Sequence, residues 1–241
     1  MVKPTLRSAK QEPGFVRRLV HELRTPLASV RVMAELLAAD PQRNLGARQL
    51  EKARSIERVA TDLGELLAAV SELDAIAGGR AGVEPEAVVL AELAGALEEE
   101  YRPLAAARGL GFEVALADPP PSLQSDRQRL RQLLRLLLDH ALGRPEAARV
   151  ALHVSGASDP ARAVTVAVRD DGRTVPEADR DSYFEPFGRA RGPSEQGGRG
   201  RLALATARAL SGLLGGELEL AARDGGGNAL VLTLPPDLGE G

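Results

Sequence analysis

Apolar residues recur every three to four positions between residues 10 and 39, and this period predicts one long amphipathic helix. Asp40 and Pro41 through Gly46 end the pattern, because proline cannot continue a helix and glycine tolerates a turn. At ~100° per residue the apolar stripe consists of Leu19, Leu23, Leu27, Val30, Ala34 and Leu37. A second, heptad-like pattern follows at Leu50, Ala53, Ile56, Ala60, Leu63, Leu67, Val70 and Leu73. Residues 10–77 therefore predict a helical hairpin.

A single hairpin of this kind leaves one apolar seam uncovered. Two hairpins bury both seams as a four-helix bundle across a twofold axis, so we expect a homodimer. A purely structural coiled coil is the other interpretation of the same heptads. It explains the seam but no polar cluster outside the seam.

Such a cluster is HELRTPL, residues 21–27. His21 points roughly 165° away from the centre of the stripe, so we expect its imidazole to be exposed to a partner rather than buried in the core. A neutral imidazole is a good nucleophile toward phosphorus near neutral pH. Pro26 lacks an N–H and clashes with the carbonyl group of Glu22, which predicts a local bend beside the histidine. An ordinary solvated helix face is the alternative interpretation of the polar residues.

The segment AGGRAG, residues 77–82, interrupts the periodicity and predicts a linker. Beyond it, residues 84–236 predict a second domain that mixes helices and strands. The predicted elements are a helix at 91–108, a strand in LGFEVAL, a capping box at Ser125 in SDRQ that opens a helix to Leu142, paired strands in ARVALHV and AVTVAVRDDG, a helix at 202–214, and strands in GELELAA and NALVLTL. This order predicts an α+β layer with helices on one face of a mixed or antiparallel sheet.

The composition excludes several classes of protein. The chain has 241 residues, 44% of them hydrophobic and 27% charged, which is typical of one or two globular domains. A net charge of −3 and 2% aromatic residues argue against a nucleic-acid partner. The absence of cysteine excludes disulfides and thiolate metal sites. No apolar run reaches the ~20 residues of a membrane span, and the N-terminus lacks the apolar core of a signal peptide, so we expect a cytoplasmic protein.

From Phe15 to Pro235 the chain resembles the catalytic core of bacterial sensor histidine kinases. F-x5-HELRTPL resembles the family's phosphoacceptor box, and the second region resembles the ATP-binding domain shared with gyrase and the Hsp90 chaperones. Its boxes follow in order as DRQRLRQLLRLLLDHAL (asparagine box), RDDGRTVPEADR (aspartate-glycine box), YFEPFGRARG (phenylalanine box), GGRGRLALATARALSGLLGG (glycine-rich lid) and DGGGNALVLTLP (closing strand). The resemblance implies a dimeric four-helix bundle followed by an α/β sandwich of the gyrase/Hsp90/histidine-kinase ATPase type.

The resemblance also implies roles for individual residues. His21 is the phosphorylated residue, Glu22 orients its ring as a base, and ATP with Mg²⁺ is the phosphoryl donor. Thr25, one turn from His21, positions water for removal of phosphate from a bound response regulator. The implied partners are the receiver domain of that regulator and a second copy of the chain. Because only twenty residues precede His21, we expect sensory input from a separate sensor protein or from a segment outside this sequence.

The asparagine box departs from the family pattern. The carboxamide that coordinates Mg²⁺ in the family is replaced by His140, and imidazole is a poor ligand for a hard ion that prefers oxygen. The basic residue three positions later is replaced by Gly143, with Arg144 beside it as a substitute. A partly exposed helix histidine is the alternative interpretation of His140.

The aspartate-glycine box keeps its first residues. Asp170 aligns with the aspartate that accepts a hydrogen bond from the adenine amine, and Gly172 follows it; an Asp-Gly turn is the alternative. Thr174 replaces the next glycine, and we expect it to restrict the backbone and to fill space beside the base.

The lid departs most. The family's Gly-Leu-Gly-Leu-Ala becomes RLALA from Arg201 to Ala205, so side chains stand where glycines let backbone N–H groups approach phosphates. Gly198 and Gly200 lie just upstream as a displaced glycine turn, and Arg201 favours an anion by its charge. The phenylalanine box keeps Tyr183, Phe184 and Phe187, which nucleotide binding and simple loop packing explain equally.

These residues predict a two-component histidine kinase core that transfers phosphoryl from ATP to His21 and then to a response-regulator aspartate. Weak ATP binding is expected, since three of the four nucleotide boxes are substituted. The alternative is a catalytically degenerate relative, a phosphotransfer, phosphatase or docking adaptor for a response regulator. A gyrase-like ATPase is a third interpretation, but it leaves HELRTPL unexplained.

Overall fold

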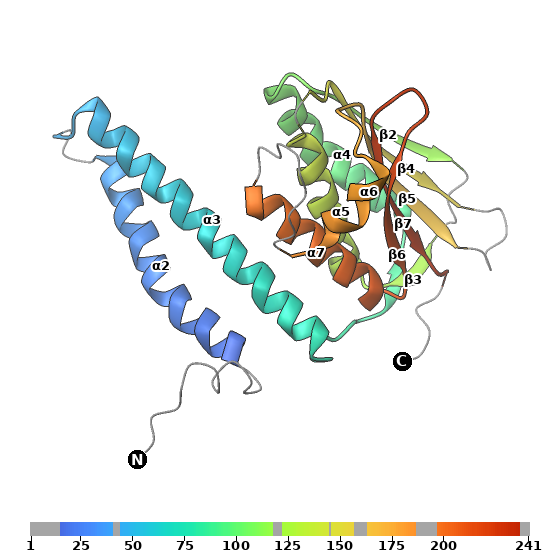
Figure 1. Ribbon diagram of the computed structural model, residues 1–241, viewed down its shortest axis with the longest axis horizontal. Helices are drawn as coiled ribbons and strands as arrows, with labels where there is room; N and C mark the ends of the chain where they lie inside the picture. The colour runs from blue at the N-terminus through green and yellow to red at the C-terminus, as the bar shows by residue number, and fades with distance from the viewer. Residues whose placement is uncertain are drawn as a thin grey trace, which may run out of the picture. The chain divides into compact units, whose positions relative to one another are not determined.

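The computed structural model describes residues 15–40, 44–117, 122–144, 146–156, 163–186 and 197–236. The chain divides into two compact units, Met1–Gly78 and Gly79–Gly241. The first unit is a helical hairpin, and the second combines helices with a sheet (Figure 1).

The hairpin consists of α2 (Phe15–Ala39) and α3 (Ala47–Ala77). Residues 10–14 of the predicted first helix lie outside the described residues. Asp40 turns the chain with a positive φ of 38°, and its carboxylate accepts hydrogen bonds from the N–H groups of Asn44 at 3.0 Å and Leu45 at 3.2 Å. The side chain of Gln49 accepts from the Gly46 N–H at 2.8 Å and so satisfies a donor at the start of α3.

Most of the predicted apolar stripe of the first helix stays outside the hairpin contact. Of its residues only Ala34 is buried, together with Val20, which the stripe did not include, and with Ala53 and Ala60 of α3. The two alanines of α3 are seven residues apart, and such small residues let the helices approach closely. Leu19, Leu23, Val30 and Leu37 are 43–51% exposed, and on α3 Ile56, Val59 and Leu63 are 46–55% exposed. The hairpin thus uses one seam internally and leaves a second apolar seam open.

Within the described residues, the second unit has four α-helices, one 3₁₀ helix and seven strands. In chain order they are β1 (Glu86–Val88), α4 (Leu90–Ala107), β2 (Gly111–Ala117), β3 (Leu123–Ser125), α5 (Arg127–Leu142), β4 (Arg149–Ser155), β5 (Val164–Asp170), α6 (Glu177–Arg180), the 3₁₀ helix η1 (Asp181–Phe184), α7 (Gly197–Leu213), β6 (Glu217–Ala222) and β7 (Asn228–Leu234). All the strands and helices expected in this region are present, and α7 begins five residues earlier than the pattern predicted.

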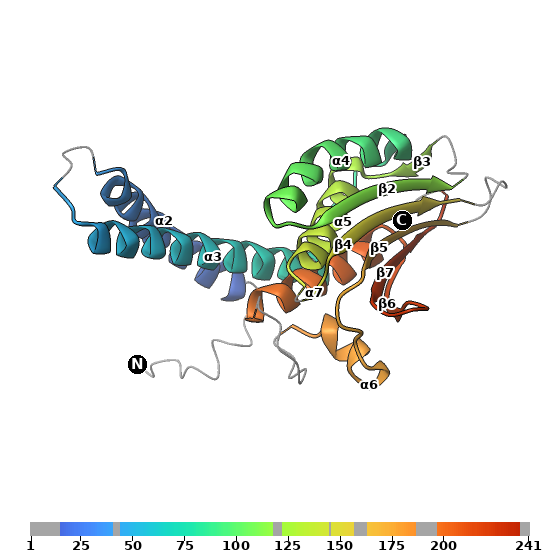
Figure 2. The same ribbon diagram turned by 90° about the horizontal axis from the view of Figure 1, so that it is seen from above.

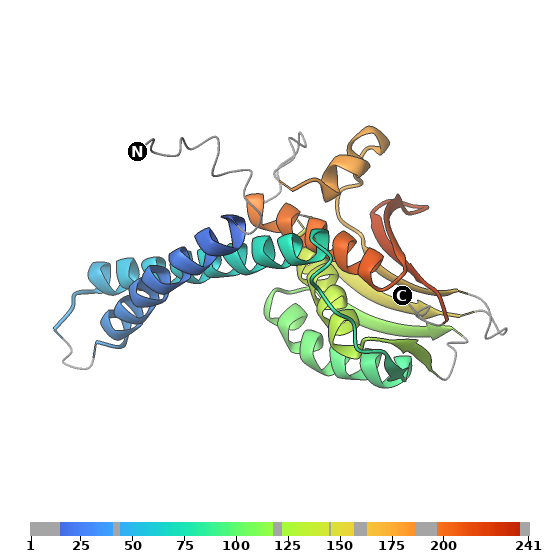
Figure 3. The ribbon, with the colours of Figure 1, turned by 90° about the horizontal axis from the view of Figure 1, so that it is seen from below.

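The main sheet has the order β2-β4-β5-β7-β6, and β1 and β3 form a separate pair. The β2–β4 pair is parallel and the others are antiparallel, so the sheet is mixed. Figures 2 and 3 show α4, α5 and α7 together on one face of it. The core lies between the two layers, where alternate strand residues meet the leucines of α5. Facing the helices are Val150, Leu152, Val154, Val166, Val168, Leu230 and Leu232.

The predicted capping box at Ser125 is wrong by one residue. Asp126 is the N-cap of α5, and its carboxylate accepts from the Arg129 N–H at 2.9 Å. Its other oxygen accepts from the Glu84 N–H at 3.0 Å, which ties the segment before β1 to the start of the helix. Aspartate is as good a cap as serine, and Ser125 is instead the last residue of β3, where it pairs with Glu86 of β1.

Candidate functional site

The predicted phosphoacceptor cluster lies on an exposed face of α2. His21, Glu22 and Thr25 are all exposed, on the opposite side of the helix from the hairpin seam. The Ser29 hydroxyl donates to the Thr25 carbonyl oxygen at 3.2 Å, and α2 runs on through Pro26. The imidazole of His21 is therefore open to a large reactant from outside the hairpin.

The predicted nucleotide residues gather where β5 ends. Asp170 and Asn228 are direct partners in the β5–β7 register, so both side chains lie on the helix-facing side of the sheet. The Asn228 amide donates to Asp170 Oδ1 at 3.0 Å, and the Gly172 N–H donates to the same oxygen at 3.0 Å. Burial raises the pKa of the Asp170 carboxyl, while the Asn228 hydrogen bond and the Arg144 charge act in the opposite direction.

Arg144 extends from the end of α5 into this cluster. Its Nε lies 3.7 Å from Asp170 Oδ1, and the two side chains are only 10% and 6% exposed. One terminal nitrogen donates to the Tyr183 hydroxyl at 3.3 Å, and the other donates to the carbonyl oxygen of Arg173. The guanidinium thus joins α5, the loop after β5 and the short helix η1.

His140 lies one turn before Arg144 in the same cluster. Its ring meets the ring of Tyr183 edge-on, with centroids 6.4 Å apart. Burial, together with the positive charge of Arg144, lowers the pKa of His140 from 6.5 to about 4. Within the described ranges, neither His140 Nδ1 nor Arg144 Nε has a hydrogen-bond partner, although both atoms are enclosed. His140 is therefore neutral at physiological pH.

Side chains from β7 and the preceding turn fasten the loop after Asp170. The Asn228 side chain accepts from the Val175 N–H at 2.8 Å and donates to the Arg173 carbonyl oxygen at 3.1 Å. Thr174 is exposed, and its hydroxyl accepts from the Gly227 N–H at 3.0 Å, so it fastens the loop to the turn before β7. A Cβ at Gly227 would collide with the Asp170 carbonyl oxygen, which explains the glycine.

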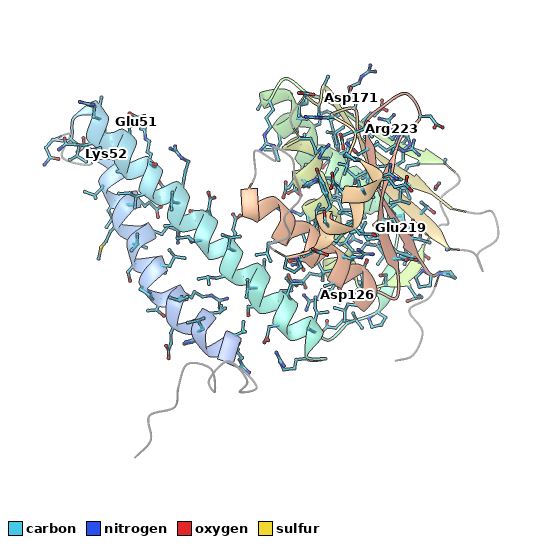
Figure 4. The ribbon with its side chains drawn as sticks, viewed as in Figure 1. Glu51, Lys52, Asp126, Asp171, Glu219 and Arg223 are labelled. Carbon is cyan, nitrogen blue, oxygen red and sulfur yellow. The ribbon has the colours of Figure 1, made fainter. Side chains whose placement is uncertain are left out.

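Two labelled residues mark the outer rim of this region (Figure 4). Asp171 accepts from the N–H groups of Ala148 at 2.7 Å and Arg149 at 2.8 Å, and these bonds lower the pKa of its carboxyl. Arg223, at the end of β6, donates to the Asp170 carbonyl oxygen at 3.1 Å. The backbone around Asp170 is therefore held from the start of β4 on one side and from the turn after β6 on the other.

The glycines of the predicted lid lie in the first turn of α7, where Gly200 is buried. For Gly198 and Arg201 only the backbone is described, and Phe187 lies outside the described residues. Phe184 is buried, and the Arg208 guanidinium of α7 lies 4.7 Å above its ring. This part of the phenylalanine box packs η1 against α7.

The environment of His140 does not fit a magnesium ligand. Mg²⁺ prefers oxygen atoms in octahedral geometry, whereas His140 offers nitrogen, is half-buried with its Nδ1 enclosed, and lies beside Tyr183 and next to the Arg144 cation. Among the side chains that the structure describes, no three His, Cys, Asp or Glu residues come together as a metal site.

Asn228 is the site residue that sequence reasoning missed. It follows three glycines and begins a strand that is otherwise almost entirely apolar, NALVLTL. A polar residue on the core-facing side of such a strand is a signal, because buried amides need partners. Its partner, Asp170, is 58 positions away, and only the strand register brings the two together.

Comparisons with known proteins agree with this architecture. Residues 14–77 match the family described as His Kinase A (phospho-acceptor) domain, and residues 125–238 match the Histidine kinase-, DNA gyrase B-, and HSP90-like ATPase family. The chain belongs to the histidine kinases. The sensory/regulatory protein RpfC of Xanthomonas campestris is 30% identical over 231 residues, which cover 94% of this chain and 31% of RpfC.

Solved structures give the same result for this histidine kinase core. The structure of full-length ShkA in complex with AMPPNP superposes with a TM-score of 0.77 and 27% identity, over 92% of this chain and 46% of ShkA. ThkA in complex with the response regulator TrrA has a TM-score of 0.61 and 16% identity, over 95% of this chain and 64% of that chain. The chain thus spans about a third of the curated relative RpfC. Within the described ranges, no helix is both long and apolar enough to cross a membrane.

Proposed function

We propose that this kinase core transfers the γ-phosphoryl group of ATP to His21. One ring nitrogen of His21 attacks the γ-phosphorus, the N–P bond forms, and the bond to the β,γ-bridging oxygen breaks, so that ADP leaves with the electron pair. Glu22 holds the other ring nitrogen and accepts its proton. The observation that carries the proposal is the exposed His21 in an intact HELRTPL segment, on a chain that matches both kinase families.

We propose a response-regulator aspartate as the next acceptor. Its carboxylate attacks the phosphorus of phosphohistidine, an O–P bond forms and the N–P bond breaks. Glu22 returns the proton to the other ring nitrogen, so that neutral imidazole leaves. Val32 and Leu36 lie within roughly 60° of His21 around α2 but about 16 and 22 Å further along its axis, and they are 46% and 63% exposed. The face of α2 that carries His21 therefore continues into exposed apolar side chains that a receiver domain could cover. The ThkA–TrrA complex is a related kinase with a bound regulator. Because ATP and receiver domains meet in the cytoplasm, we place both reactions there.

The open seam of the hairpin supports a homodimer. Leu19, Leu23 and Val30 of α2 continue the same side of the hairpin as Ile56 and Leu63 of α3. Burial of these exposed apolar residues against the same surface of a second copy stabilises a dimer. The proposed dimer is therefore a four-helix bundle with each His21 on its outer surface.

Incubation of the chain with γ-labelled ATP tests the kinase activity. We expect label on the protein that is stable to base and labile to acid, as a phosphoramidate is, and its complete loss in His21→Gln. His153→Gln is the control, because His153 lies on β4 in the other unit. Label that persists in His21→Gln would rule out His21 as the acceptor.

A phosphotransfer adaptor without ATP chemistry is the second candidate. The enclosed Asp170 and the Arg144 guanidinium beside it favour this candidate, since they leave the expected base-reading carboxylate only 6% exposed. An adaptor exchanges phosphate between His21 and a regulator but acquires no label from ATP. The labelling experiment therefore separates the two candidates.

A further inference from the structure

The carboxylate expected to read the base is covered from within the chain. The Asp170 side chain is 6% exposed, and Arg144 lies against it with its own side chain 10% exposed. Arg144 thus contributes to closing the carboxylate to solvent on the side of Oδ1. A base amine that approaches from this side competes with the guanidinium for the carboxylate.

The contact between Arg144 and Asp170 leaves polar atoms without hydrogen bonds. At 3.7 Å the Arg144 Nε is too far from Asp170 Oδ1 for a hydrogen bond, and it has no other partner among the described residues. His140 Nδ1, one turn away, is enclosed and unpartnered as well. Enclosed polar atoms without partners destabilise the arrangement that encloses them. A ligand that displaces Arg144 removes the free-energy cost of leaving the Arg144 Nε without a partner.

Arg144 is also free to move without breaking a helix. It follows Gly143, the C-cap of α5, so its side chain is carried by the chain just beyond the helix. Two hydrogen bonds hold its terminal nitrogens, to the Tyr183 hydroxyl and to the Arg173 carbonyl oxygen. Asp170 keeps its bonds from Asn228 and Gly172 when the guanidinium leaves.

We propose that Arg144 is a side-chain latch that closes the base-binding position over Asp170, and that nucleotide binds only to the form in which this latch is open. The proposal rests on the proposed function, because it assumes that Asp170 faces the base of ATP. It adds a regulatory residue to that site. Any interaction that draws the Arg144 guanidinium away from Asp170, such as a carboxylate from a partner, increases nucleotide affinity.

Calorimetric titration of the full chain with Mg-ATP tests the latch. If the closed form exceeds about 90% of the molecules, Arg144→Met increases the affinity by at least about tenfold. Methionine keeps an unbranched apolar stem but removes the charge and the donors. Arg149→Met is the matched control, because Arg149 is 82% exposed and pairs with Asp171 at 3.8 Å. Unchanged or weaker binding in Arg144→Met, including no binding at millimolar ATP, would overturn the latch.

A second measurement uses the unaltered chain, so that its result does not depend on whether Arg144→Met folds. The enclosed Nε–H of Arg144 gives a nitrogen–proton NMR signal, assigned by its absence in Arg144→Lys, and saturating Mg-ATP should shift it. A signal that stays fixed while nucleotide binds would contradict the latch. Tighter binding in Arg144→Met without any label on His21 keeps the latch and rejects the kinase proposal. Label on His21 together with unchanged affinity in Arg144→Met keeps the kinase proposal and rejects the latch.

Discussion

Two histidines mark the two regions of this kinase core, and their surroundings differ in every respect. His21 is exposed on α2 and shares its face of the helix with the exposed Val32 and Leu36 further along. His140 lies at the end of α5 with an enclosed Nδ1, against Tyr183 and next to a cation. The phosphoacceptor region is open to partners, whereas the nucleotide region is closed by its own side chains.

The difference follows from what each region has to accommodate. A phosphoacceptor meets a nucleotide and then a receiver domain, so it gains from a solvated ring on a rigid helix. The end of β5 instead has polar groups that the chain partly satisfies internally, through Asn228, Thr174 and Arg144, while Arg144 Nε and His140 Nδ1 stay without a partner among the described residues. Such a network specifies one conformation, and a ligand must replace part of it. The comparison predicts that phosphate exchange at His21 is more robust than ATP binding.

The open seam of the hairpin gives the largest expected effect. We expect Leu63→Asp to convert the dimer into a monomer, because a carboxylate buried without a partner in the bundle costs several kcal/mol. Light scattering of the full chain at micromolar concentration measures the mass. Leu104→Asp is the matched control, since Leu104 of α4 is 47% exposed and Leu63 is 46% exposed. A monomeric unaltered chain would remove the basis for the four-helix bundle.

The sequence predicted elements better than contacts. Heptads and strand alternation identified both hairpin helices and the strands of the main sheet, because these patterns are local. The stripe of α2 was read as one surface, yet Ala34 packs inside the hairpin and Val30 stays exposed. The two positions differ by only ~40° around the helix, and the close approach of α3 separates them.

The sequence predicted where the nucleotide region lies but not which of its side chains contact one another. Family boxes located Asp170, His140 and Arg144, but no pattern in the chain shows that Arg144 turns onto Asp170. That contact depends on Tyr183 and Asn228, which lie 39 and 84 positions from Arg144 and are brought there by η1 and the strand register. Interactions between distant segments of this kind have no local periodicity to predict them.

The enclosed ring of His140 predicts a pH dependence of stability. Its folded pKa is about 4 and its ordinary value is 6.5, so the unfolded chain binds a proton that the folded chain does not. Stability is therefore full above pH 6.5 and is lost as the pH falls from 6.5 toward 4, by about 2 kcal/mol at pH 5. Urea unfolding followed by circular dichroism between pH 5 and 8 measures this change, as the chain has no tryptophan.

Substitution separates this contribution from the others. We expect His140→Gln to flatten the pH dependence between pH 5 and 6.5. His153→Gln is the control and keeps most of the slope, although burial also lowers the pKa of the less enclosed His153. An equal slope in His140→Gln and the unaltered chain would mean that the His140 ring is solvated, and the contrast with His21 would disappear.

The smallest effect concerns Thr25 and tests whether the open face has a second activity. A regulator already phosphorylated on aspartate is mixed with the chain in the absence of nucleotide, and loss of its label is followed. Back-transfer needs only the His21 ring, since the regulator supplies its own carboxylates. Hydrolysis instead needs a water molecule held near the acyl phosphate, which is the role that resemblance gives to the Thr25 hydroxyl. Losing one hydrogen bond of about 1.4 kcal/mol slows that step about tenfold.

Thr25→Ala should therefore slow the release of free phosphate about tenfold and leave the labelling of His21 unchanged. Ser29→Ala is the matched control, because Ser29 is an exposed hydroxyl on the same helix that donates to the Thr25 carbonyl oxygen. His21→Gln removes the labelled intermediate and so shows whether phosphate leaves directly from the regulator or by way of the histidine. If neither Thr25→Ala nor His21→Gln changes the rate, the exposed face of α2 binds regulators without acting on their phosphate.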